Sequence, residues 1–262
     1  MMKLAVNLSL IFTEVPLIER FALAQVHGFK HIEIQFPYEL TIEQIQTQLS
    51  KNHLTLCLIN APAGDLMQGG NGLAGIPGME LEFHRGLEKA IQYATALNVP
   101  SINILAGKQP IDCDLLPCLN TLTQNLKLAC SMLSLHHIQP VVEMINGTDM
   151  PRFLIQNIAQ AQEILEAVQQ PALKMQYDCY HMAMMGEDLL ETLKENIQEI
   201  GHIQFADCPN RHQPDTANID FAAIFEWLQH SAYKGYLAAE YRPQGHSKNS
   251  FAWKDKYFVK HH

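Results

Sequence analysis

Short hydrophobic runs alternate with longer amphipathic segments along the whole chain. The runs are rich in β-branched and other apolar residues and are bounded by turn-forming residues, which is typical of buried strands. The predicted strands are residues 4–9, 31–35, 54–59, 101–105, 140–144, 173–177, 202–206 and 236–240.

The segments between these runs carry apolar residues at helical spacing. In one of them Leu87, Ile91 and Ala94 lie on a single stripe opposite polar residues, as expected for a helix with one buried face. Asp149-Met150-Pro151 predicts a helix start, because proline is favoured in a first helical turn. The predicted helices are residues 14–26, 41–50, 80–97, 115–135, 151–168, 187–199 and 221–230.

This alternation predicts a parallel sheet. Strands separated by helices are normally parallel, because a parallel neighbour requires a crossover connection. Eight such units in 262 residues match a closed (β/α)8 TIM barrel, whose usual size is about 250 residues. The alternative is an open doubly wound sheet, which favours a glycine-rich turn after the first strand, and residues 8–13 contain no glycine. No linker divides the sequence, so we expect one α/β barrel domain over residues 1–262.

Composition and charge narrow the classes of partner. With 18 Lys+Arg against 27 Asp+Glu the formal net charge is −9, which disfavours binding to nucleic-acid backbones. We expect no membrane segment, since no apolar run approaches the roughly 20 residues of a membrane span, and no signal peptide. The six cysteines form no Cys-x-x-Cys pair, which suits reduced thiols in the cytoplasm. The sequence does not determine the oligomeric state, and a homo-oligomer is one alternative.

Two long connections follow predicted strands. Residues 60–78 contain six glycines, and residues 207–220 contain Pro209 and Pro214. Long loops in compact domains are often binding loops, and loops after the strands form the face of a barrel that carries its chemistry. We expect both connections at that face, with simple mobility as the alternative explanation for the glycines.

Polar side chains stand at the ends of the last four predicted strands. They are Glu143, Asp178, Gln204 and Glu240, each one strand–helix unit after the previous one. Barrel closure would bring the four together at one mouth. A single carboxylate at a strand end often caps the next helix or forms a salt bridge, and Asp178 could do so. The repetition over four strands favours a shared site.

Three carboxylates in one pocket repel each other and are costly to bury without a compensating cation. Three carboxylates with an amide oxygen form a hard oxygen-ligand set that suits Mg²⁺ or Mn²⁺. Zinc normally takes histidine or cysteine ligands. The sequence therefore predicts one divalent metal ion, most favourably Mg²⁺ or Mn²⁺, held by Glu143, Asp178, Gln204 and Glu240.

The chain resembles the hydroxypyruvate isomerase family of the xylose-isomerase-like barrels, including its 2-oxo-tetronate isomerase branch. The resemblance covers nearly the whole sequence. Its motifs are Ala5-Val6-Asn7-Leu8-Ser9, Phe12-Thr13-Glu14-Val15-Pro16, Phe36-Pro37-Tyr38, residues 58–65, Glu143, Tyr177-Asp178-x-Tyr180-His181, His202-Ile203-Gln204, Arg211-His212-x-Pro214, Gly235-Tyr236 and Glu240-Tyr241-x-Pro243.

The resemblance implies a barrel with the same four metal ligands, with Glu143 and Glu240 as proton-transfer groups. It also implies that His181, Arg211 and His212 contact the substrate. Lys108, just past the fourth predicted strand, is a further candidate for the substrate carboxylate, with a solvated loop lysine as the alternative. The sequence departs from the family at several loop positions that bear on substrate identity and loop closure: Gly70, Asn71, Met79, Gln213 and Asn218.

The implied reaction interconverts hydroxypyruvate and 2-hydroxy-3-oxopropanoate (tartronate semialdehyde). One glutamate removes a proton and the other returns it on the adjacent carbon, through an enediolate that a divalent metal stabilises. Alternatives on the same scaffold are a 2-oxo-tetronate isomerase, a ketose 3-epimerase and an inosose-type dehydratase. A non-catalytic sugar-acid binder is a further alternative. A DNA endonuclease of this superfamily would need additional histidine ligands and a basic face.

Overall fold

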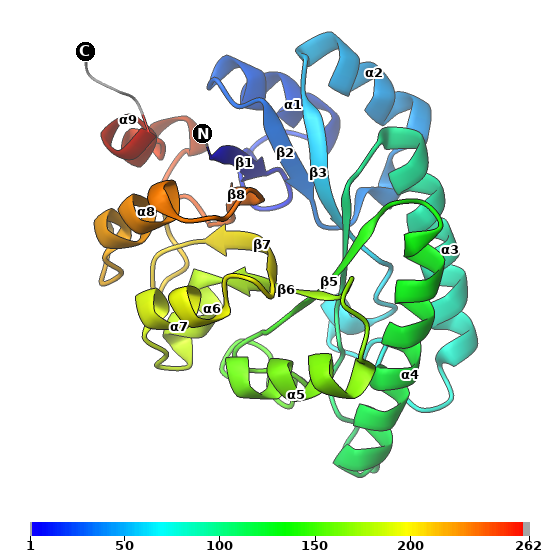
Figure 1. Cartoon of the computed structure of the whole chain (residues 1–262). Helices are drawn as coiled ribbons and strands as arrows, with labels where there is room; N and C mark the ends of the chain where they lie inside the picture. Colours follow the sequence, from blue (N-terminus) through cyan, green and yellow to red (C-terminus); the bar gives the residue numbers. More distant parts are fainter. Residues whose placement is uncertain (1, 259–262) are drawn as a thin grey trace.

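Eight short apolar segments form the strands of a closed parallel barrel in the computed structural model, which describes residues 2–258 (Figure 1). The strands follow the chain order around the barrel, and β1 pairs with β8 to close it. They are β1 Lys3–Asn7, β2 His31–Ile34, β3 Thr55–Asn60, β4 Ser101–Ile104, β5 Gln139–Glu143, β6 Lys174–Asp178, β7 Ile200–Phe205 and β8 Tyr236–Ala239. The predicted TIM barrel is confirmed.

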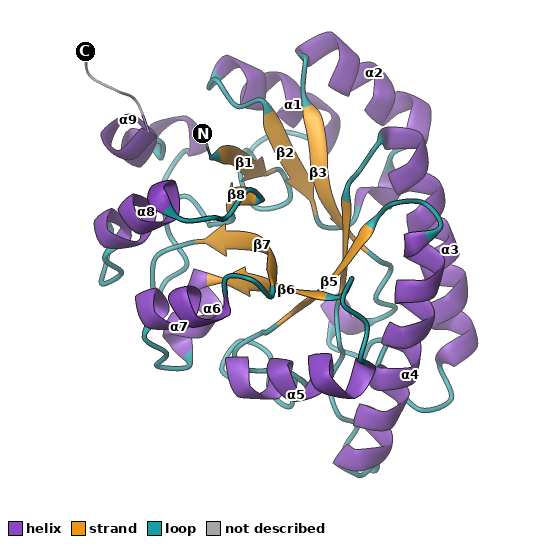
Figure 2. Ribbon diagram, in the orientation of Figure 1, coloured by secondary structure: helices purple, strands orange, loops and turns teal. Residues whose placement is uncertain are grey.

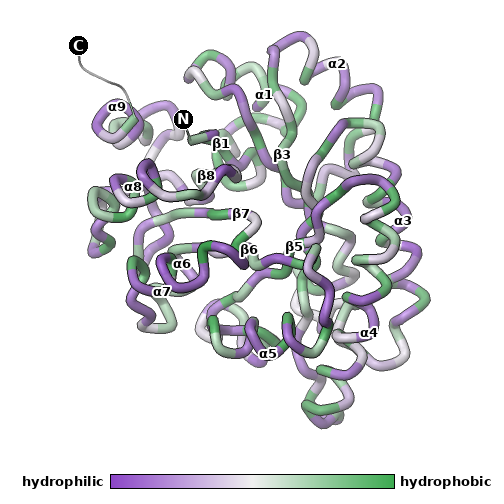
Figure 3. Tube along the Cα trace, viewed as in Figure 1, coloured by the Kyte–Doolittle hydropathy of each residue, from purple (hydrophilic) through white to green (hydrophobic). Residues whose placement is uncertain are grey.

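Helices surround the barrel on its outer side (Figure 2). Green hydrophobic and purple hydrophilic stretches alternate along outer helices such as α3 and α4 (Figure 3), because one side of each helix packs on the strands. The helices are α1 Leu17–Val26, α2 Ile42–Asn52, α3 Glu80–Leu97, α4 Leu115–Ser134, α5 Ile158–Val168, α6 Cys179–Met184, α7 Leu189–Asn196, α8 Phe221–His230 and α9 Ala252–Phe258. None of these helices has the length and apolar character of a membrane span.

The predicted helix over 151–168 is wrong in its first half. Helix α5 begins at Ile158, where the side chain of Asn157 accepts a hydrogen bond from the Gln160 backbone N–H and caps the first turn. The preceding segment instead folds back over the barrel mouth, where the Ile145 N–H donates to the Ile155 carbonyl. Pro151 lies in this turn, so the proline signal marked a loop.

Two helices have no counterpart in the prediction, and others have shifted ends. Helix α6 follows β6 directly and has six residues, too few for a periodic pattern to be visible. Helix α9 closes the described part of the chain. Helix α1 begins after Pro16 rather than at residue 14, and α7 covers only the middle of the predicted 187–199.

The parallel register brings all the carboxyl ends of the strands to one mouth. Asn7, Asn60, Glu143 and Asp178 are the last residues of β1, β3, β5 and β6, and Glu240 directly follows β8. All five side chains are buried. The barrel therefore presents a ring of buried polar groups at this end.

Candidate active site

The four side chains predicted as metal ligands lie at or next to the carboxyl ends of β5 to β8. Glu143, Asp178, Gln204 and Glu240 are all buried, and Asp178 and Gln204 are register partners on β6 and β7. Asp178 caps the next helix, which was the alternative to a shared site, and it also faces the other polar groups at the mouth. Its Oδ1 accepts from the Tyr180 N–H and caps α6, while its Oδ2 faces the site.

Arg211 lies between two of these carboxylates. Its Nη2 is 3.1 Å from Asp178 Oδ2 and 2.5 Å from Glu240 Oε2, and its guanidinium stacks 5.0 Å from the ring centroid of Tyr180. The Arg211 backbone has φ 55°, a left-handed conformation that is unusual for a residue with a side chain. Such conformations persist where the surroundings hold them in place, commonly at functional sites.

Burial and mutual repulsion raise the pKa of the carboxyl groups. Burial, then the nearby charge of Asp178, raises the pKa of Glu143 to about 8. Burial raises the pKa of Asp178 to about 6 even though Arg211 opposes the shift, and it raises the pKa of Glu240 well above its usual range. Burial lowers the pKa of Arg211, but Glu240 and Asp178 outweigh that effect and raise it overall. The three carboxyl groups of the site therefore exceed the single positive charge that Arg211 supplies.

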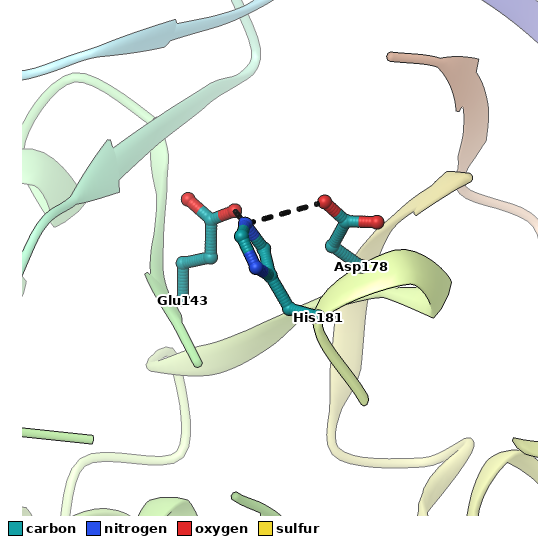
Figure 4. A group of neighbouring side chains, drawn as sticks. All are labelled: Glu143, Asp178 and His181. Carbon is teal, nitrogen blue, oxygen red and sulfur yellow. Dashed lines mark ion pairs between the residues drawn. The ribbon is translucent and has the colours of Figure 1, made fainter. Parts of the chain in front are cut away.

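His181 joins the carboxylates from helix α6 (Figure 4). Its Nε2 lies 3.6 Å from Asp178 Oδ2 and 4.0 Å from Glu143 Oε1, and ligand atoms of the three residues fall within 4.8 Å of one another. By distance alone, these three residues form a candidate metal site.

The hydrogen bonds of His181 favour a donor rather than a metal ligand. The Asn146 side-chain oxygen accepts from the Thr148 and Asp149 N–H groups, so its amide nitrogen points at His181 Nδ1, 2.7 Å away. Nδ1 is therefore an acceptor, and the neutral ring carries its proton on Nε2. Burial lowers the pKa of His181 well below its usual value, which keeps the ring neutral. His181 thus presents an N–H to the site, which suits the predicted contact with substrate.

Two asparagines and a glutamine, none of which the strand-end pattern singled out, orient the two glutamates. Asn103 Nδ2 donates to Glu143 Oε2 at 2.8 Å, from the strand next to β5. Asn7 Nδ2 donates to Glu240 Oε1 at 2.8 Å, from the strand next to β8, and Gln35 Nε2 adds a second donor at 2.9 Å. Each glutamate therefore has one oxygen held by amide donors. The second oxygen of Glu240 pairs with Arg211, and that of Glu143 lies 4.0 Å from His181 Nε2. Asparagines inside two predicted strands, residues 4–9 and 101–105, were the available signal.

A fourth buried carboxylate lies deeper inside the barrel. Glu33 Oε2 is 2.7 Å from His202 Nε2, and Glu33 Oε1 accepts from Gln204 Nε2 at 2.6 Å. The amide oxygen of Gln204 accepts from Gln176 at 2.7 Å, which leaves it one further lone pair. Gln204 is thereby fixed in orientation next to Asp178. A glutamate inside the apolar run 31–35 could have indicated this group.

Two predicted substrate contacts lie elsewhere. Lys108 Nζ donates to the Gly69 carbonyl at 2.8 Å and fastens the glycine-rich connection to the one after β4. His212 Nδ1 donates to the Arg242 carbonyl at 2.8 Å. Neither residue lines the cavity at the barrel mouth. Both join loops around the site through these hydrogen bonds to backbone carbonyls.

A cavity of about 460 Å³ opens at the barrel mouth, and Glu143 is the one predicted metal ligand in its lining. Residues from several strand-to-helix connections line it, which matches the expected position of the site on this face. Its polar lining includes Gln35, Glu143, Asp149, His181, Arg211 and Arg242. The volume suits a small, polar ligand.

The comparisons with known proteins agree with this geometry. A family model described as "Xylose isomerase-like TIM barrel" matches residues 21–257. Hydroxypyruvate isomerase of Escherichia coli (strain K12) is 38% identical, with 98% of this chain and 100% of that protein covered. 2-oxo-tetronate isomerase of Cupriavidus necator is 35% identical, with 98% and 99% covered.

A solved structure has the same fold over nearly the whole chain. The crystal structure described as AP endonuclease, family 2 from Brucella melitensis superposes with a TM-score of 0.94 at 33% identity, covering 98% of this chain and 99% of that one. The relatives match over their full length, and the barrel, its mouth and its buried carboxylates are all present. The chain therefore belongs to the hydroxypyruvate isomerase family of xylose isomerase-like TIM barrels, and it is an isomerase.

Proposed function

We propose that the protein interconverts hydroxypyruvate and 2-hydroxy-3-oxopropanoate, with Glu143 and Glu240 moving a proton between adjacent carbons. The observation that carries this is the matched orientation of the two glutamates, each with one oxygen held by an asparagine from the neighbouring strand. Two held carboxyl groups at one mouth are what a two-base proton transfer requires. The pKa of Glu143, raised to about 8, lies close to neutral pH, where a proton-transfer group is most effective.

The residues at the mouth fit a divalent cation, for which we propose Mg²⁺ or Mn²⁺. Glu143, Asp178 and Glu240 are three buried carboxyl groups with raised pKa values, and Gln204 offers an amide oxygen beside Asp178. This set of oxygen donors matches the preference of both ions. When bound, the ion supplies Lewis-acid stabilisation of the negative charge that develops on the substrate oxygens.

The other side chains bind and orient the substrate. The His181 Nε2–H is placed to donate to a substrate oxygen between Glu143 and Asp178. Arg211 supplies positive charge at the floor of the cavity. A neutral donor and a fixed guanidinium stabilise developing negative charge without removing the proton that the glutamates must move.

A 2-oxo-tetronate isomerase is the second candidate. The relatives described as hydroxypyruvate and 2-oxo-tetronate isomerases are nearly equally similar, at 38% and 35% identity, and a cavity of about 460 Å³ holds a four-carbon acid as readily as a three-carbon one. In both cases the substrate is a small hydroxy-oxo acid. We also propose that the chain works as one domain in the cytoplasm. Six free thiols support the reducing compartment.

The test is an NMR assay of hydroxypyruvate and 2-oxo-tetronate with the purified protein in D₂O, with Mg²⁺, Mn²⁺ or a chelator. We expect isomerisation with deuterium entering the product, loss of activity with chelator, and recovery when the ion is restored. Glu240→Gln should lower kcat by about 100-fold or more, whereas Glu163→Gln, an exposed control on α5, should not.

Three results would contradict this proposal. Glu240→Gln activity within tenfold of wild type would refute the two-glutamate transfer. Turnover indifferent to chelator would refute the metal. Loss of water, or an epimer as the product, would instead indicate a dehydratase or an epimerase.

A further inference from the structure

Arg211 already pairs with two protein carboxylates, so its single charge cannot also balance the full charge of a substrate carboxylate. Its Nη2 contacts both Asp178 and Glu240, and its side chain is only 15% exposed. A substrate that carries its own carboxylate needs a separate cation or donor, because an unpaired anion in a cavity is costly. The cavity would otherwise repel an acid, since Asp149 also lines it.

Arg242 is the second cationic side chain in the lining of the cavity. It directly follows Tyr241, two residues after Glu240, and its side chain is exposed at the rim. Among residues 2–258, no carboxylate lies within ion-pair distance of its guanidinium. Lys108, the other cation near the mouth, is bonded to the Gly69 carbonyl and does not line the cavity.

The backbone of Arg242 is held on both sides. Its N–H donates to the Arg211 carbonyl at 2.7 Å, and its carbonyl accepts from His212 Nδ1 at 2.8 Å. These bonds join the connection after β7 to the one after β8, so the stem of the Arg242 side chain has a fixed origin beside Arg211. A guanidinium on a fixed backbone loses less freedom when it binds a carboxylate.

We propose that Arg242 binds the carboxylate of the substrate and makes the enzyme selective for hydroxy-oxo acids over neutral sugars. The inference rests on the proposed function for its substrate class. The guanidinium forms a bidentate pair with the carboxylate at the rim, while the hydroxy-oxo carbons lie deeper, between Glu143 and Glu240. His212 is a positioning residue for Arg242, which explains why it lies beside the cavity without lining it.

The test compares D-glycerate with D-glyceramide, its neutral counterpart of nearly the same shape. Dissociation constants are measured by calorimetry or ligand-observed NMR, with Mg²⁺ present, for wild type, Arg242→Gln and Arg242→Lys. We expect Arg242→Gln to reduce the preference for the acid over the amide by about 10- to 100-fold, and Arg242→Lys to restore part of it. In turnover, Arg242→Gln should raise KM for hydroxypyruvate far more than it lowers kcat.

The matched control is Lys248→Gln, which removes one exposed positive charge from the same connection without touching the cavity. It should leave the preference unchanged. An acid-to-amide preference within twofold of wild type in Arg242→Gln would overturn the proposal, as would an equal loss in Lys248→Gln. A wild-type protein that fails to isomerise either acid would refute the proposed function, whereas the binding comparison would still decide the role of Arg242.

Discussion

Asn103 influences both the direction and the protonation of Glu143. It donates a hydrogen bond to Glu143 Oε2, and this bond lowers the pKa of that carboxyl group against the larger effect of burial. Asn103 does not line the cavity. It is therefore a positioning residue, and its removal should shift the pH dependence of kcat.

We predict that Asn103→Ala raises the pKa of Glu143 further and moves the acid limb of the kcat–pH profile upward by about 1 to 2 pH units. The reason is that a hydrogen bond to a charged group contributes about 1.5–3 kcal/mol. The profile is measured by following hydroxypyruvate isomerisation. Asn196→Ala, at another buried asparagine far out on α7, should lower stability without moving the limb. An unchanged kcat–pH profile in Asn103→Ala would show that Asn103 does not set the pKa of Glu143.

At the scale of elements, the junction of β6 and α6 combines a helix cap and a proposed metal ligand in one residue. Asp178 ends the strand and caps the helix through Oδ1, while Oδ2 faces Arg211. An asparagine retains the capping oxygen but removes the charge, whereas alanine removes both. The two tasks can therefore be separated by substitution.

We predict that Asp178→Asn unfolds in urea, in the presence of chelator, at least as late as wild type, because it removes a buried carboxyl group with a raised pKa. Asp178→Ala should be about 1 kcal/mol less stable than Asp178→Asn, which is the usual cost of losing a cap. Added Mg²⁺ should stabilise wild type and neither variant. Equal stability of the two variants would show that the cap contributes nothing, and Mg²⁺ protection of Asp178→Asn would argue against Asp178 as a ligand.

At the scale of the whole molecule, the buried carboxyl groups couple stability to pH and, under the proposed function, to the metal. Glu143 and Glu240 have raised pKa values in the folded protein, so the folded state keeps protons that the unfolded state has already lost. Stability from these groups is therefore present at low pH and decreases as pH rises from about 4.5 toward 8. A bound divalent cation favours the ionised carboxylates and reverses this trend.

We predict that Mg²⁺ raises Tm more at pH 8 than at pH 6, and that its binding releases protons. Thermal unfolding with Mg²⁺ or chelator at both pH values measures the first effect. Calorimetry in buffers of different ionisation enthalpy measures the second. Equal Tm shifts at the two pH values, without proton release, would contradict the assignment of these carboxyl groups to the metal.

Much of the architecture was predictable from the pattern of residues. Helix α3 and helix α8 have the predicted bounds, because their apolar stripes are long and unbroken. The first half of the predicted helix 151–168 failed, because a proline that can begin a helix can equally sit in a turn. Helix α6 was not predicted because its six residues are too few to show a helical repeat of apolar positions.

The sequence by itself determined the barrel and its ring of strand-end carboxylates, because burial and alternation are local properties that repeat along the chain. Only the tertiary structure decided how those groups are used. The pairing of Asn7 with Glu240, the donor face of His181 and the exposed guanidinium of Arg242 each depend on residues from different strands or loops. Those contacts form when the barrel closes and its connections pack together, and no local pattern records which partner each polar atom will meet.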